Sequence, residues 1–127
     1  MLMANWRLIG SPSDFFVMAH PSGNYLVVYT RAAFDNLLAE LRARTADKTE
    51  LADIERGLND KVRCSKLDRF GRLPLPPDLI AKTGIARQAE LVGRFSRFEI
   101  WPCDKYEATQ NERDQATASA LRNLESL

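Results

Sequence analysis

Residues 61–78 of the chain have the sequence KVRCSKLDRFGRLPLPPD, and this stretch decides the predicted fold. Apolar and polar residues alternate in two short segments, 62–67 and 72–75, and alternation with a period of two is typical of half-buried strands. The tetrapeptide DRFG at 68–71 separates them, and its glycine can adopt the positive φ of a tight turn. The stretch therefore predicts a β-hairpin that ends at a pair of prolines.

The predicted hairpin also concentrates positive charge. The whole chain has a formal net charge of +1, so its bulk charge does not indicate a nucleic-acid partner. Asp68 is the only acid between Lys61 and Arg72. The basic side chains of the stretch are Lys61, Arg63, Lys66, Arg69 and Arg72. Any contact with nucleic acid must therefore depend on this local cluster.

Composition excludes several classes of protein. The chain has 127 residues and 45% hydrophobic content, enough for one domain with its own core. We expect no membrane span and no secretion signal. Two distant cysteines, Cys64 and Cys103, favour reduced thiols in a cytosolic protein, and the single histidine, His20, gives little support to a metal site. With no catalytic Ser-His-Asp or Cys-His set evident, the sequence predicts neither an enzyme nor a cofactor or small-molecule substrate.

The segments on either side of the hairpin predict a mixed α+β fold. We expect strands at 15–19 and 25–29, then a helix capped by Thr30. Asp47 with Glu50 resembles a capping box, so the next segment is a second helix or the continuation of one bent helix. After the hairpin we expect a short helix closed by Gly84 and strands at 90–93 and 95–101. The polar C-terminal segment is either a docking helix or a mobile tail.

The two halves of the chain show the same order of turn, hairpin and helix, which indicates an internal repeat. The comparison equates residues 26–29, LVVY, with residues 98–101, FEIW. Residues 61–106 also resemble the second repeat of the MraZ family of SpoVT-AbrB-like transcriptional regulators. The matching motifs are Leu67-Asp68-x-x-Gly71-Arg72-Leu73, Leu75-Pro76-Pro77-x-Leu79, Thr83-Gly84-Ile85, Glu90-Leu91-Val92-Gly93 and Arg97-Phe98-Glu99-Ile100-Trp101. Residues 4–60 resemble the family more loosely. The first repeat's own hairpin has no counterpart in this sequence, either because the sequence starts downstream of the true beginning or because this is a degenerate member.

This resemblance implies a swapped-hairpin β-barrel of two pseudo-repeats. It divides the chain into a partial first repeat (1–45), a helical connector (46–60), a complete second repeat (61–110) and a polar C-terminal tail or helix (111–127). By resemblance the protein is cytoplasmic and nucleoid-associated, assembles into a homo-oligomeric ring, and binds double-stranded DNA at promoter repeats of the division and cell-wall gene cluster. The competing hypothesis is an oligomerisation or protein-partner module of the same fold that does not bind DNA.

The family's Asp-x-x-x-Arg signature falls on Asp68 and Arg72. We expect Arg72 to contact DNA, followed by Arg69 and Lys66, with Arg63 further from the tip. Asp68 orders the turn or orients Arg72, and Gly71 supplies turn geometry. The alternative is an ordinary ion pair in a hairpin turn. Phe70 is either an exposed aromatic residue of the turn or a residue that plugs the barrel, and we favour packing. We assign Trp101, Phe98 and Phe95 to the core or a subunit interface rather than to base stacking.

Overall fold

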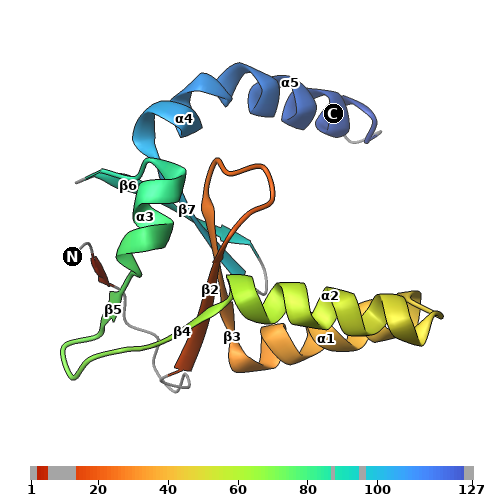
Figure 1. The fold of residues 1–127 in the computed structure, drawn as a ribbon. Helices are drawn as coiled ribbons and strands as arrows, with labels where there is room; N and C mark the ends of the chain where they lie inside the picture. Colours follow the sequence, from red (N-terminus) through yellow and green to blue (C-terminus); the bar gives the residue numbers. More distant parts are fainter. Residues whose placement is uncertain (1–2, 6–13, 87, 95–96, 125–127) are drawn as a thin grey trace.

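The computed structural model describes residues 3–5, 14–86, 88–94 and 97–124, and it confirms a mixed α+β fold (Figure 1). The strands are β1 (Met3–Asn5), β2 (Asp14–Ala19), β3 (Leu26–Thr30), β4 (Arg63–Lys66), β5 (Arg72–Pro74), β6 (Ala89–Arg94) and β7 (Arg97–Pro102). The helices are α1 (Arg31–Arg44), α2 (Lys48–Lys61), α3 (Pro77–Thr83), α4 (Cys103–Ala108) and α5 (Gln110–Arg122). Within these described ranges, no helix has the length and apolar character needed to cross a bilayer.

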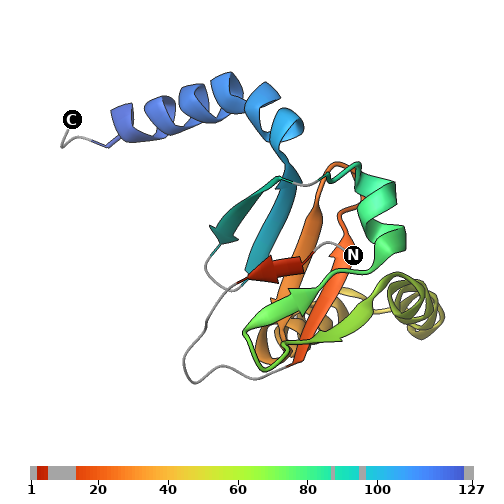
Figure 2. The same cartoon turned by 90° about the vertical axis from the view of Figure 1, so that its left-hand side faces the viewer.

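Two antiparallel sheets form the body of the molecule. The larger sheet has five strands in the order β4-β2-β3-β7-β6, and the smaller sheet pairs β1 with β5. Figure 2 shows the β1–β5 pair crossing one face of the larger sheet. The main core includes side chains from both sheets together with α3 and the residues around it. Its buried members are Phe15, Val17, Leu26, Val28, Leu73, Leu75, Leu79, Ile85 and Ile100.

Helix α1 covers the opposite face of the large sheet. Phe34 from this helix stacks on Phe16 of β2, with ring centroids 4.6 Å apart, beside the buried side chains of Val27 and Tyr29. Because successive side chains of a strand point to opposite faces, β3 contributes to both clusters and is buried along most of its length. The large sheet is therefore the central layer of the fold.

Helices α1 and α2 are separate, which decides between the two alternatives predicted for this segment. The Thr30 side chain accepts a hydrogen bond from Ala33 N–H, and the Asp47 carboxylate accepts from Thr49 N–H and Glu50 N–H, so both predicted N-caps are confirmed. The two helices run side by side away from the sheet (Figure 1). Gly84 closes α3 with φ of 79°, as predicted.

The ladder between β3 and β7 has a local twofold arrangement. Val27 lies opposite Glu99, and the neighbouring pairs are Leu26 with Ile100 and Val28 with Phe98. The repeat comparison equates Val27 with Glu99, Leu26 with Phe98 and Val28 with Ile100, so a twofold axis through the Val27–Glu99 pair relates the two strands. On one side of this axis β2 pairs with β3 and also with β4, whereas on the other side β6 pairs with β7 and lies at the edge of the sheet. Strand β4 pairs with the outer edge of β2. Among the described residues, no strand pairs with the outer edge of β6.

The prediction of a two-stranded hairpin at residues 61–75 is wrong. Both strands exist, but β4 pairs with β2 and β5 pairs with β1, so they belong to different sheets. The Ser65 hydroxyl donates a hydrogen bond to the Pro74 carbonyl over 2.6 Å, and a closed turn joins the strands. Alternation identified each strand correctly, but it carries no information about which strand would be its partner.

The two ends of the chain also differ from expectation. Strand β1 was not predicted, while residues 6–13 and Phe95 lie outside the described residues. The C-terminal segment is helical, as α4 and α5, yet α5 buries none of its described side chains and projects from the body (Figure 2). Of the two alternatives for this segment, a docked helix is not what the described residues form, since α5 is helical but packs none of its side chains into the core.

Candidate nucleic-acid interface

The turn between β4 and β5 is organised around the carboxylate of Asp68. Its Oδ1 accepts hydrogen bonds from Phe70 N–H at 2.8 Å and Arg72 N–H at 2.9 Å, and its Oδ2 accepts from Arg72 Nε–H at 2.9 Å. Asp68 thus binds the backbone of the turn with one oxygen and the arginine side chain with the other. Short polar side chains commonly stabilise turns in this way, and a charged acceptor strengthens each bond.

Backbone geometry closes the same turn. Asp68 N–H donates to the Arg72 carbonyl at 2.8 Å, and Gly71 N–H donates to the Asp68 carbonyl at 3.0 Å. Gly71 has φ of 76°, a conformation that strains any residue with a Cβ atom. The hydrogen bond from Arg72 N–H, followed by those from Phe70 N–H and the Arg72 side chain, lowers the pKa of Asp68 below its ordinary value of 3.8. The carboxylate is therefore ionised at neutral pH, and both of its oxygens can accept these hydrogen bonds.

Three side chains extend from this turn into solvent, and we define Arg69, Phe70 and Arg72 as the turn tip. The guanidinium carbons of Arg69 and Arg72 lie 4.9 Å and 5.0 Å from the centroid of the Phe70 ring. Arg72 uses its Nε–H on Asp68, and its two terminal nitrogens make no hydrogen bond to any described residue. The tip thus presents cationic donors whose positions are set by the turn.

The remaining predicted site residues occupy different surroundings. Lys66 lies at the end of β4 with its Nζ 3.8 Å from Asp14, and its side chain is largely exposed. Arg63 donates to the Asp60 carbonyl at the end of α2 over 2.8 Å and pairs with Asp78 at 3.4 Å. The structure therefore places Lys66 within the same strand-and-turn segment as the tip, whereas Arg63 links α2 to the start of α3.

Of the two alternatives for Phe70, the exposed aromatic residue of the turn is confirmed and the favoured packing role is wrong. Its side chain is 56% exposed, the largest exposure of any large hydrophobic residue in the described part of the chain. The apolar residues of the turn that do pack are Leu67 and Leu73, on either side of it. The sequence contained a usable signal, since Phe70 lies between two arginines at a position where the chain must reverse direction.

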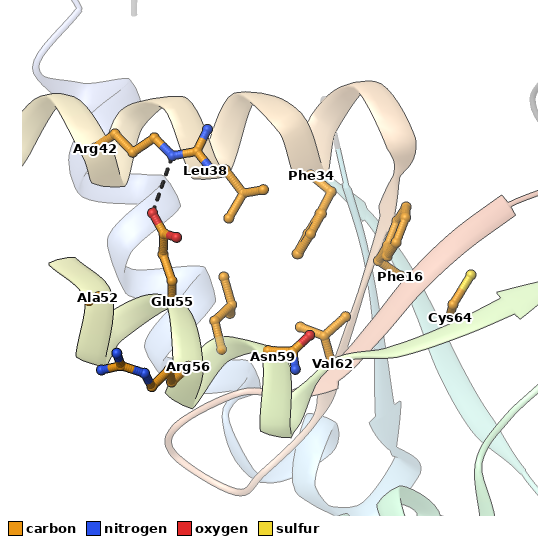
Figure 3. Close-up of a pocket in the computed structure, with 11 residues that line it drawn as sticks. Phe16, Phe34, Leu38, Arg42, Ala52, Glu55, Arg56, Asn59, Val62 and Cys64 are labelled. Carbon is orange, nitrogen blue, oxygen red and sulfur yellow. Dashed lines mark hydrogen bonds and ion pairs between the residues drawn. The ribbon is translucent and has the colours of Figure 1, made fainter.

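A second candidate site is a cavity of about 630 Å³ between α1, α2 and the neighbouring strands (Figure 3). Phe16, Phe34 and Leu38 line its apolar part, and an ion pair between Arg42 and Glu55 spans it at 3.3 Å. This ion pair joins the two helices, so the polar groups of the cavity already have a structural role. The cavity is the space within a helical hairpin, and its lining does not indicate a ligand of particular chemistry.

The described residues contain no cluster of three or more histidine, cysteine or acidic side chains that could hold a metal ion. Both cysteines are free thiols, Cys64 on the exposed side of β4 and Cys103 at the start of α4. The turn between β4 and β5 is consequently the arrangement with the most distinctive chemistry. It combines fixed geometry, exposed positive charge and an exposed aromatic ring, and such a surface can bind an anionic polymer.

Comparison with known proteins finds one matching family model and several similar proteins. The family model described as "MraZ protein, putative antitoxin-like" matches residues 63–125, which include the whole turn. Three proteins named transcriptional regulator MraZ are similar to the chain. The protein from Alcanivorax borkumensis is 28% identical over 97 residues, covering 76% of this chain and 66% of its own length.

The protein from Pelobacter propionicus is 32% identical over 93 residues, covering 71% of this chain and 57% of the relative. The protein from Thioalkalivibrio sulfidiphilus is 27% identical over 124 residues, covering 95% of this chain and 83% of the relative. The chain thus spans less than two thirds of the length of the first two of these regulators. Similarity nevertheless extends across most of the chain and is not confined to the turn.

Proposed function

The chain belongs to the MraZ family, and we propose on that premise that it is a DNA-binding transcriptional regulator without enzymatic activity. The observation that carries the proposal is the exposed basic turn, in which Asp68 holds Arg72 while leaving its terminal nitrogens available. An arginine fork held in this way can donate two hydrogen bonds to a guanine or grip a phosphate. Lys66 and Arg69 add charge that neutralises neighbouring phosphates.

The proposed roles of the individual residues follow from their contacts. Arg72 is the principal DNA contact, Arg69 and Lys66 bind phosphates, and Asp68 and Gly71 maintain the turn. Arg63 adds positive potential from further away, because its guanidinium is already engaged with Asp60 and Asp78. The contacting element is a closed turn supported by two sheets, which differs from the free two-stranded ribbon expected from the sequence.

Within the mixed α+β class, we propose that the fold is the swapped-hairpin barrel of the MraZ family. The twofold arrangement about Val27 and Glu99 supports two pseudo-repeats, a partial one at residues 1–45 and a complete one at 61–110. Residues 46–60 connect them as a helix, and 111–127 follow as the polar C-terminal segment. Strand β4 pairs with β2 of the other repeat, and this pairing between the two repeats supports the proposed barrel.

Assembly is part of the proposed mechanism. A single turn with about three phosphate contacts binds weakly by itself, whereas an oligomer on repeated sites gains avidity because each later contact is intramolecular. The edge of β6, with Leu91 48% exposed, is a surface through which chains can associate. We propose a homo-oligomeric ring acting in the cytoplasm at the nucleoid, on promoter repeats of the division and cell-wall genes.

A second candidate function is a protein-partner module of the same fold. The family description contains the term antitoxin-like, and the exposed edge of β6 can accept a strand from another protein. This alternative does not require the turn tip to contact DNA. Measurement of salt-dependent DNA binding separates the two functions.

The test is a fluorescence-anisotropy titration with duplex DNA from the region upstream of the gene and with a scrambled duplex, at two salt concentrations. We expect preference for the upstream duplex, weaker binding at higher salt, and a loss of about 1–3 kcal/mol in Arg72→Ala. Arg56→Ala is the matched control, because Arg56 is an exposed arginine on α2 that pairs with Asp53 away from the turn.

Two results contradict the proposal. If neither duplex binds at low salt, the chain is not a DNA-binding regulator and the protein-partner function is favoured. If Arg72→Ala and Arg56→Ala lose affinity equally, the effect is one of net charge and the turn is not the contact surface. Circular dichroism of both variants confirms that each remains folded.

A further inference from the structure

Phe70 is an apolar ring that the folded chain holds in solvent. Its backbone N–H donates to Asp68 Oδ1 at 2.8 Å, which fixes the residue at the tip of the turn. The ring is 56% exposed, although burying a phenylalanine side chain typically contributes about 1.5–3 kcal/mol. In the described part of the chain, the Phe70 side chain therefore contributes little burial energy to folding.

The surroundings of the ring are cationic. The guanidinium carbons of Arg69 and Arg72 lie 4.9 Å and 5.0 Å from the ring centroid, within the range of cation–π attraction. These contacts orient both arginines beside the ring. The surface that complements this arrangement carries negative charge close to a small apolar group.

The major groove of DNA has this combination of features. Phosphates border the groove, and each thymine presents its C5-methyl group there, which is the one apolar group on the base edges and a known contact for phenylalanine. The minor groove offers no such methyl group. An acidic peptide is also complementary to the two arginines, but the proposed function makes DNA the partner of this turn.

We infer that Phe70 contacts a thymine methyl group in the major groove and gives the protein a preference for thymine beside the bases or phosphates bound by Arg69 and Arg72. This inference rests on the proposed DNA-binding function. It assigns to Phe70 a role in sequence specificity, whereas the arginines provide most of the affinity. Residues 69–72 of the turn then combine binding of charged groups by the two arginines with recognition of a methyl group by Phe70.

Replacement of thymine by deoxyuridine tests the inference, because it removes only the C5-methyl group and leaves base pairing intact. The probes are the upstream duplex that binds the protein and the same duplex with deoxyuridine at every thymine. We expect the wild-type chain to lose about fourfold in affinity for each methyl group that it contacts. Phe70→Ala should bind both duplexes equally, whereas Phe70→Leu, which retains an apolar side chain, should keep part of the preference.

The outcomes distinguish the inference from the function on which it rests. Binding that depends on Arg72 but is equal for the two duplexes in the wild-type chain overturns the role of Phe70 and leaves the regulator intact. An equal deoxyuridine effect in the wild type and in Phe70→Ala assigns the methyl contact to another residue and also overturns the inference. Absence of any DNA binding by the wild type overturns both proposals together.

Discussion

Arg72 donates two hydrogen bonds to the carboxylate of Asp68. Its backbone N–H donates to Oδ1 and its Nε–H donates to Oδ2, each at a distance of 2.9 Å. The two residues therefore close the turn and orient the guanidinium group in one arrangement. An ordinary ion pair on a surface contributes little to stability, because two flexible side chains must be ordered to form it. Here the backbone bond already positions Arg72, so less side-chain freedom is lost.

Substitution of Asp68 by asparagine should weaken DNA binding by roughly three- to tenfold, although it removes a negative charge from a basic surface. The reason is that the amide is a weaker acceptor and no longer orients Arg72. A purely electrostatic effect would have the opposite sign. Anisotropy titration measures the change, and Asp53→Asn on α2 is the control for charge. Tighter binding by Asp68→Asn would show that Asp68 does not position the arginine.

The turn should lose stability in acid. Folding lowers the pKa of Asp68, chiefly through its bond from Arg72 N–H, so ionised Asp68 favours the folded state. This contribution is fully present above the unfolded pKa near 3.8 and is lost as pH falls through the lower folded pKa. The amide proton of Phe70, followed by NMR between pH 7 and pH 2, should shift in that acidic window. No shift in that window, or the same shift in Asp68→Asn, would contradict this assignment.

Two glycines should respond to alanine with opposite signs. Gly71 has φ of 76°, so Gly71→Ala should destabilise the protein by about 1–2 kcal/mol. Gly57 lies inside α2, and a Cβ added there meets no described atom within 4 Å, so Gly57→Ala should stabilise by about 0.5–1 kcal/mol. Urea denaturation measures both changes. Equal effects at the two positions would argue against a left-handed conformation at Gly71.

Leucines of the core and of α5 should contribute very differently to the free energy of unfolding. Leu73 is fully buried between the two sheets, and Leu73→Ala should cost about 2–5 kcal/mol in unfolding free energy. Leu121 is 45% exposed on a helix that buries none of its described side chains, so Leu121→Ala should change stability by less than about 0.5 kcal/mol. A large loss at Leu121 would indicate that α5 packs against another chain.

The edge of β6 should control self-association. A lysine in place of Leu91 puts charge beside the unpaired backbone groups of this strand and opposes pairing with another chain. We expect Leu91→Lys to shift sedimentation velocity profiles toward smaller species, while Leu121→Lys on α5 leaves them unchanged. An unchanged profile for Leu91→Lys would place the contact between chains elsewhere.

The sequence by itself determined the local features of this protein. The caps at Thr30 and Asp47, the closure of α3 by Gly84 and the turn around Asp68 were all predictable. Each depends on a hydrogen bond or a backbone conformation within about four residues, so the nearby sequence contains all the interacting groups. The same reasoning located the strands on either side of the turn.

Tertiary structure alone decided which strands pair and which side chains remain exposed. Strand β4 joins β2 and strand β5 joins β1, because alternation is satisfied equally well by any partner that buries the same face. Arg63 forms an ion pair with Asp78, fifteen residues away in the sequence. Phe70 remains in solvent beside two guanidinium groups. These outcomes depend on packing among segments distant in sequence, where many arrangements have similar local energies.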